Sequence, residues 1–187
     1  YCSVREDERL ASLFAAADAG AALVDVEWYA ATPETLSRIR SAGSAVIVSR
    51  HAFDRTPVDL GDWASGIEAS NPDVVKVVGM ARQAVDVRRV LAVLQRARQP
   101  TIAIAMGSVG RASRILALRY EQCFLTFAAP RLNSGTAPGQ IHIDELRDVY
   151  RAEGIGPATK VYIVAGATIG DDVMFDLNSR LREAGLN

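Results

Sequence analysis

Short apolar runs alternate with amphipathic helical patterns at intervals of about 25 residues, and this alternation constrains the fold more than any other feature. The predicted strands are residues 22–27, 45–49, 74–78, 101–106 and 123–127, and the predicted helices are 7–19, 33–41, 60–69, 85–98 and 110–120. Strands that alternate with helices predict parallel βαβ units. The pattern alone leaves a doubly wound sheet and a (β/α)8 barrel open.

Two Thr-Pro pairs, Thr32-Pro33 and Thr56-Pro57, resemble helix starts. Threonine is a good N-cap residue, and proline is favoured at the first helical position. We therefore expect a helix to begin at each pair.

Composition narrows the class of protein. With 187 residues, 49% of them hydrophobic, the chain fits one domain, or one domain plus a fragment of a second. Its net charge of −1 argues against a nucleic-acid surface, and no apolar run approaches the roughly 20 residues that span a membrane. Cys2 and Cys123 match no disulfide or metal framework. We therefore predict a cytoplasmic protein without a metal site.

Polar residues cluster where the predicted strands end. His51 follows strand 45–49, Lys76 lies within the next strand, and Gly107 and Ser108 end the strand after that. A glycine-rich loop at 133–140 follows the last strand. Polar groups at the carboxyl ends of successive parallel strands are typical of a barrel active site. No Gly-x-Gly-x-x-Gly turn or Walker loop indicates a nucleotide fold.

Lys76 is the most distinctive single residue. The chain has 21 basic residues, of which only Lys76 and Lys160 are lysines, and Lys76 lies within the apolar run 73–79. Lysine can lose its proton when buried, whereas arginine cannot, and a neutral amine can form a Schiff base with a carbonyl. The alternative reading is a lysine on the open face of an edge strand.

Five short motifs, in this order, carry a resemblance to a known family. They are Val-Asp-Val-Glu at 24–27, Ser-Arg-His-Ala-Phe-Asp-Arg-Thr-Pro at 49–57, Asp-Val-Val-Lys at 73–76, Met-Gly-Ser-Val-Gly-Arg-Ala-Ser-Arg at 106–114 and Thr-Ala-Pro-Gly-Gln at 136–140. The resemblance that they carry extends over roughly residues 1–150. The chain thus resembles the type I 3-dehydroquinate dehydratases, the Schiff-base enzymes of the shikimate pathway, which leads to chorismate and the aromatic amino acids.

The resemblance implies a role for each matched residue. Lys76 falls on the lysine that forms an imine with the C3 ketone of 3-dehydroquinate, and His51 falls on the general acid/base that removes the C2 proton. Arg114 matches the arginine that pairs with the substrate carboxylate. Gln140 matches a substrate-contacting glutamine, and Thr136 stands where the family usually has serine.

Neighbouring residues have more ordinary interpretations. Met106 is expected in the core, and His142 is expected as a structural residue at the start of a helix. Glu27 is either a carboxylate near Lys76 or a strand-end acid that binds backbone groups. Ala52 replaces the acidic or amide residue that usually follows the family's histidine, which weakens the support of His51.

The resemblance also predicts the domain organisation. It implies a (β/α)8 TIM barrel of which about five βα units are present, so we expect residues 1–154 to be a barrel segment that is inactive or poorly folded alone, or a fragment of a longer chain. Residues 155–187 resemble the opening of a shikimate dehydrogenase, a short αβ extension. Asp171 and Val173 there replace the Ser-x-Ser pair that holds the shikimate carboxylate.

The resemblance predicts a lyase, a hydro-lyase that converts 3-dehydroquinate to 3-dehydroshikimate, within a bifunctional dehydratase–dehydrogenase. It implies no cofactor for the dehydratase, and NADP only if a complete dehydrogenase domain follows. The expected partner is this small-molecule substrate, with no nucleic acid or membrane, and the protein can form a homodimer. Two alternatives remain: a metabolite-binding regulator like the fungal quinate-pathway repressors, and an inactive fragment.

Overall fold

The computed structural model describes residues 5–130, 137–162 and 171–185. Its helices are α1 (Glu6–Asp18), α2 (Pro33–Ser41), α3 (Leu60–Glu68), α4 (Ala84–Arg96), α5 (Ser113–Leu116) and α6 (Asp171–Glu183). Its strands are β1 (Leu23–Glu27), β2 (Ala45–Ala52), β3 (Val74–Met80), β4 (Thr101–Met106), β5 (Ala128–Ala129) and β6 (Ile141–His142). Short 3₁₀ turns (Trp28–Ala30, Val109–Ala112, Ala117–Arg119, Ala152–Gly154) and a π-helical turn (Glu145–Val149) complete the elements.

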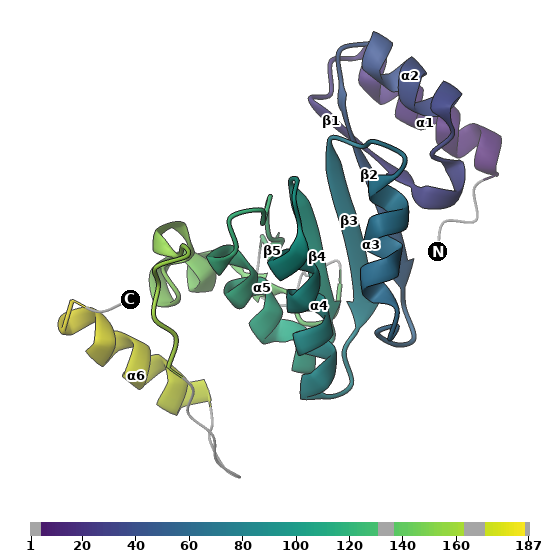
Figure 1. Ribbon diagram of the computed structural model, residues 1–187. Coiled ribbons are helices and arrows are strands. Elements are labelled where there is room, and N and C mark those ends of the chain that lie inside the picture. Colours follow the sequence, from purple (N-terminus) through teal and green to yellow (C-terminus); the bar gives the residue numbers. More distant parts are fainter. Residues whose placement is uncertain (1–4, 131–136, 163–170, 186–187) are drawn as a thin grey trace.

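Strands β1 to β4 form one parallel sheet in sequential order (Figure 1). Sequential order favours the barrel-type alternative, because a doubly wound sheet reverses its strand order near the middle. Within the described residues β1 has a strand neighbour on one side only, so the sheet is an open arc rather than a closed barrel.

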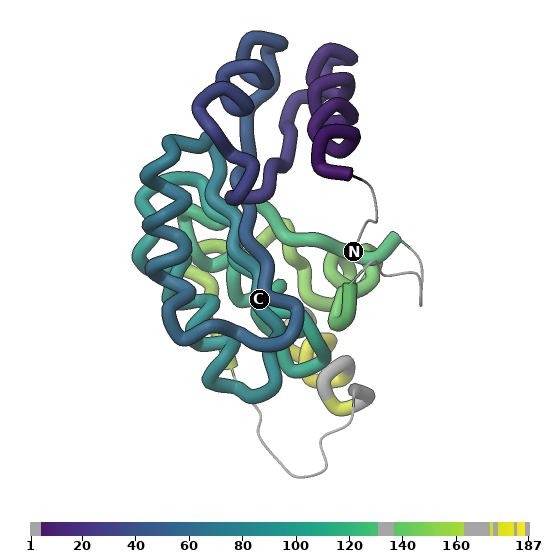
Figure 2. Tube along the Cα trace, turned by 90° about the vertical axis from the view of Figure 1, so that its right-hand side faces the viewer, coloured from purple at the N-terminus to yellow at the C-terminus, as the bar shows by residue number. Residues whose placement is uncertain are grey.

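The two faces of the sheet have separate apolar clusters. On the outer face, α1 to α4 pack on strand residues that include Val24, Val48, Val75 and Val77. The inner face carries Ile47, Val74, Val78, Ile102, Ile104 and Met106, against which Leu125 and Ala137 pack. Figure 2 shows the same layering: α3 lies on one side of the strands and the green segment after residue 120 lies on the other. Met106, 5% exposed, is a core residue as predicted.

The four long strands and their helices are confirmed because their apolar periodicity is continuous. One of the two helix starts is also confirmed: the Thr32 hydroxyl accepts a hydrogen bond from the Thr35 backbone N–H. The start predicted at Thr56-Pro57 is wrong. The buried Thr56 hydroxyl instead donates to the Met80 carbonyl at 2.9 Å, and α3 begins at Leu60.

The predicted fifth strand, 123–127, is also wrong. It makes a single bridge, between Thr101 and Cys123, and then leaves the edge of β4. Leu125 packs on the inner apolar cluster, so burial of this side chain draws the segment across the inner face, where the Phe127 ring lies near Lys76. The two-residue strand β5 pairs in parallel with β6 instead.

One smaller prediction is corrected. The predicted helix 110–120 is helical but divided, with α5 between two 3₁₀ turns. The backbone before α5 packs closely on β4, because a Cβ on Gly110 would lie 2.2 Å from the Ala105 carbonyl oxygen. His142 ends β6 directly before the helical residues 143–149, at the start of a helix as predicted, and its Nδ1 accepts a hydrogen bond from the Asp144 backbone N–H at 3.3 Å.

Candidate active site

The charged side chains of the sheet share its inner face. Strand side chains alternate between the two faces, so Asp25 and Glu27 of β1, Ser49 and His51 of β2, and Lys76 of β3 all lie opposite the helices. Glu27, Ser49 and Lys76 are in register across three strands, and His51 lies two residues further along β2. The fold thus brings together the two predicted catalytic residues, Lys76 and His51.

Lys76 is held by a carboxylate that the sequence analysis did not assign. Its Nζ donates to Asp25 Oδ2 at 2.6 Å, its side chain is 13% exposed, and it lies 5.3 Å from the centre of the Phe127 ring. Asp25 is two strands away from Lys76, so only the strand order and register place them together. Glu27, in register with Lys76 on the same face, forms an ion pair with Arg9 of α1.

His51 lies at the end of β2 and stacks on Phe53, with ring centres 5.6 Å apart and planes within 5°. Burial lowers the pKa of His51, and the positive charge of Lys76 lowers it further, while Asp25 and Glu27 act in the opposite direction. The imidazole is therefore neutral at pH 7 and can accept a proton. In the described part of the chain no hydrogen bond joins His51 to Lys76.

A cavity of about 500 Å³ opens beside His51 at the carboxyl ends of β1 and β2. Its lining residues come from α1, β1, β2 and the segments that follow the two strands: Arg9, Glu27, Trp28, Tyr29, Ser49, Arg50, His51 and Phe53. The Arg50 guanidinium lies between two indole rings, 4.6 Å from Trp28 and 3.6 Å from Trp63. This stacking fixes one wall of the cavity.

Arg114 of α5 is buried, with 2% of its surface exposed. Its Nε donates to the Gly139 carbonyl at 3.0 Å and its NH1 to the Phe127 carbonyl at 3.4 Å, and burial lowers its pKa. No carboxylate pairs with Arg114 within residues 5–130, 137–162 and 171–185. Phe127 thus links Arg114 to Lys76, because its carbonyl contacts one and its ring lies near the other.

The loop before β6 docks on the end of β4. The Gly107 backbone N–H donates to the Pro138 carbonyl at 3.0 Å, and Gly139 has φ +77° with no room for a Cβ, which would lie 2.1 Å from the Gly107 oxygen. Gln140 follows directly and is half-buried, so the fold carries it next to the carbonyl that Arg114 binds. Thr136 lies outside the described residues.

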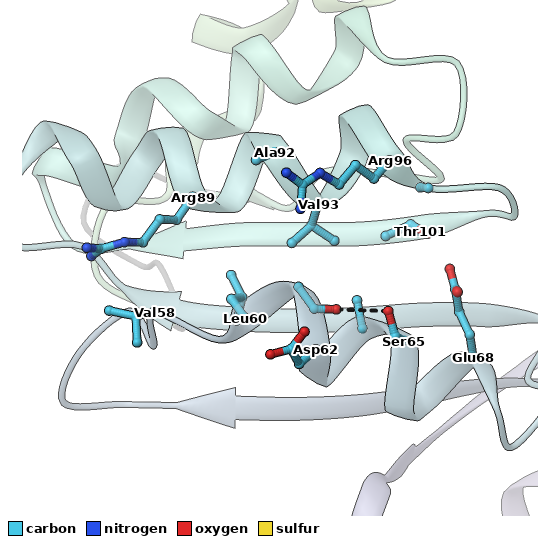
Figure 3. Close-up of a pocket in the computed structure, with 13 residues that line it drawn as sticks. Val58, Leu60, Asp62, Ser65, Glu68, Arg89, Ala92, Val93, Arg96 and Thr101 are labelled. Carbon is cyan, nitrogen blue, oxygen red and sulfur yellow. Dashed lines mark hydrogen bonds between the residues drawn. The ribbon is translucent and has the colours of Figure 1, made fainter.

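A second cavity, of about 230 Å³, lies away from these residues on the outer side of the sheet. In Figure 3 its walls are α3, with Asp62, Ser65 and Glu68, and α4, with Arg89 and Arg96. None of the predicted site residues lines it. Among the described residues no group of three His, Cys, Asp or Glu side chains could hold a metal ion, and none of the described helices could cross a membrane.

The parallel sheet has its strands in sequential order, with helices on one face and a lysine, a carboxylate and a histidine on the other. This arrangement is typical of a barrel-type α/β protein. The family model of type I 3-dehydroquinase matches residues 1–157. The chain belongs to this family.

Individual relatives agree. The chain is 34% identical over 168 residues to the bifunctional 3-dehydroquinate dehydratase/shikimate dehydrogenase of Arabidopsis thaliana chloroplasts, covering 88% of this chain and 28% of the relative. It is 31% identical over 159 residues to the 3-dehydroquinate dehydratase of Methanocaldococcus jannaschii, covering 81% and 70%. The crystal structure of 3-dehydroquinate dehydratase from Geobacillus kaustophilus superposes with a TM-score of 0.69 at 28% identity, covering 79% of this chain and 60% of that one. The chain therefore spans only part of the length of these relatives.

Proposed function

We propose that this chain carries the Schiff-base site of a 3-dehydroquinate dehydratase, a hydro-lyase of the shikimate pathway. The observation that carries the proposal is Lys76, a largely buried lysine in contact with a carboxylate, on the same face as His51. Both lie in the region matched by the family model. A lysine kept on a surface for solvation alone would not need such surroundings.

In the proposed reaction the Lys76 amine attacks the C3 ketone of 3-dehydroquinate and forms an iminium, and one water leaves. His51 then takes the C2 proton, for which its lowered pKa keeps it neutral at pH 7. The electron pair of the C–H bond moves toward the iminium nitrogen. When this electron pair returns toward carbon, the C1 hydroxyl takes up a proton and leaves as a second water. Hydrolysis of the iminium releases 3-dehydroshikimate and restores Lys76.

We propose that Arg114 binds the substrate carboxylate and that Gln140 and Thr136 contact the substrate from the loop. Arg114 supports this role because its acceptors among the described residues are two neutral backbone carbonyls. A carboxylate would supply the missing opposite charge and two parallel acceptors for the guanidinium fork. The dehydratase chemistry uses side chains only, and NADP enters only if a complete dehydrogenase domain follows.

We further propose that residues 1–154 form the barrel segment and 155–187 begin a shikimate dehydrogenase-like domain. The family match ends at residue 157, close to this boundary, and the Arabidopsis relative is bifunctional. Limited proteolysis tests the boundary: first cleavage between residues 150 and 162 agrees with it, and first cleavage inside the sheet contradicts it. A cytoplasmic location and a homodimer stay predictions, and the Arabidopsis relative is chloroplastic.

The proposal is tested by borohydride trapping. The protein is incubated with 3-dehydroquinate, reduced, and its intact mass measured, alongside Lys76→Met and Lys160→Met. Lys160 is the matched control because it is the other lysine and is exposed. We expect one stable adduct on the wild type and on Lys160→Met, and none on Lys76→Met; this result would overturn the expectation from the sequence that residues 1–154 are inactive or poorly folded alone. Binding of 3-dehydroquinate without any adduct on the wild type would favour the metabolite-binding alternative instead.

A further inference from the structure

We propose that Asp25 is a catalytic residue of this site: its carboxylate takes the proton that the Lys76 ammonium must lose before the amine can attack a carbonyl. The inference deepens the proposed function and rests on the imine chemistry assigned to Lys76. It goes beyond the match of motifs, which gives Asp25 no role.

The first observation is the contact itself. Lys76 extends across β2 to reach β1, where its Nζ lies 2.6 Å from Asp25 Oδ2. This distance is at the short end for a charge-assisted N–H···O bond. Among the described residues of β1 and β2, the titratable groups on this face are Asp25, Glu27 and His51, and the segment after β4 contributes the Phe127 ring. Glu27 is engaged by Arg9, so Asp25 is the carboxylate that contacts the amine.

The second observation is the other carboxylate oxygen. About a third of the Asp25 side chain is exposed, yet Oδ1 itself is buried and accepts no hydrogen bond from the described residues. A buried carboxylate oxygen without a donor is costly, so such groups often mark functional sites. A salt bridge kept only for stability would be expected to have both oxygens satisfied. Oδ1 can instead accept a hydrogen bond from the carbinolamine hydroxyl or from the water that leaves it.

In the proposed step the ammonium of Lys76 gives one proton to Asp25 Oδ2, and the freed electron pair on Nζ forms the bond to the carbonyl carbon. The carbonyl oxygen gains two protons, one from Asp25 and one from the former amine, and leaves as water. The product is an iminium with one positive charge, so the Asp25 carboxylate faces a cation before and after the step. The same ion pair therefore serves the resting lysine and the intermediate.

The test uses formaldehyde, a carbonyl small enough to reach a half-buried amine, with cyanoborohydride as the hydride donor. Peptide mass spectrometry follows the methylation of Lys76 relative to Lys160 in the same molecule. In the folded wild type at about pH 7 we expect Lys76 to react faster than Lys160, although its side chain is 13% exposed and Lys160 is exposed. Slower reaction of Lys76 would overturn the proposal, because burial alone predicts that result.

The variants separate a chemical role from a structural one. Asp25→Asn should lower the ratio of methylation at Lys76 to methylation at Lys160 roughly tenfold or more near neutral pH, since the isosteric amide cannot take a proton. The ratio should recover at high pH, where hydroxide can take the proton in place of Asp25. Asp62→Asn, the same change at an exposed site of α3, should leave the ratio unchanged. Asp25→Glu should restore part of the ratio, as it keeps the carboxylate.

An unchanged or higher ratio in Asp25→Asn, or a loss that persists at high pH in a folded variant, would refute the role of Asp25. This result is distinguishable from failure of the proposed function, since formaldehyde is not the proposed substrate. If 3-dehydroquinate gives no adduct while Asp25→Asn still lowers formaldehyde labelling, the dehydratase assignment fails and the Asp25 assignment stands. If the adduct forms equally in wild type and Asp25→Asn, only the Asp25 assignment fails.

Discussion

Gly139→Ala should release the loop that carries Gln140 from the end of β4. The added Cβ would lie 2.1 Å from the Gly107 carbonyl oxygen, so the two backbones must separate by about 1 Å to reach a tolerable contact. That movement stretches two 3.0 Å hydrogen bonds out of range: Gly107 N–H to the Pro138 carbonyl, and Arg114 Nε–H to the Gly139 carbonyl. The second involves a charged donor and is the more costly to lose.

The magnitude follows from these two bonds. Their loss costs about 2–4 kcal/mol, which should speed exchange of the Gly107 amide hydrogen by roughly 30- to 700-fold. Alanine also pays about 1–2 kcal/mol for a left-handed backbone. Gly43→Ala isolates this second cost, because Gly43 has φ +90° but no atom within 4 Å of its Cβ position.

Hydrogen exchange measured by mass spectrometry on a peptide that contains Gly107 is the direct assay. We expect fast exchange in Gly139→Ala and wild-type protection in Gly43→Ala, whose effect should stay near the turn before β2. Urea denaturation should show a larger loss of stability for Gly139→Ala than for Gly43→Ala. Equal protection of Gly107 in all three proteins would refute the reasoning, since it would mean that the loop does not depend on this close approach.

Two further predictions concern the cavity beside β2. Burial and a neighbouring ammonium lower the pKa of His51 below 6.5 in the folded protein. As pH falls, His51 therefore binds a proton in the unfolded chain before it does so in the folded protein. The free energy of unfolding should thus fall as pH drops from about 6.5. His51→Gln should flatten this dependence on pH. Urea denaturation at several pH values that gives the same pH dependence of the unfolding free energy for wild type and His51→Gln would contradict the shift. Arg50→Lys should cost about 1 kcal/mol by weakening the stacking between two indole rings, whereas Arg88→Lys at an exposed site of α4 should be neutral. Equal urea midpoints for these two lysine variants would count against a stabilising role of the stack.

Much of the fold could be predicted because β1 to β4 are short, mainly apolar strands and their helices have a clear apolar period. The unusual lysine was also visible, since lysine is rare in this arginine-rich chain. The partner of Lys76 was not, because Asp25 lies two strands away and only register brings the two together. Apolar periodicity likewise predicted a strand at 123–127 that does not form, because burial of Leu125 on the inner face competes with pairing to β4.

The central claim is that Lys76 forms an imine with 3-dehydroquinate. The most direct measurement is peptide mapping of the wild-type protein after incubation with 3-dehydroquinate and reduction with borohydride. We expect the reduced adduct on the peptide that contains Lys76, with Lys160 unmodified in the same sample. An adduct on Lys160, or equal modification of both lysines, would contradict it.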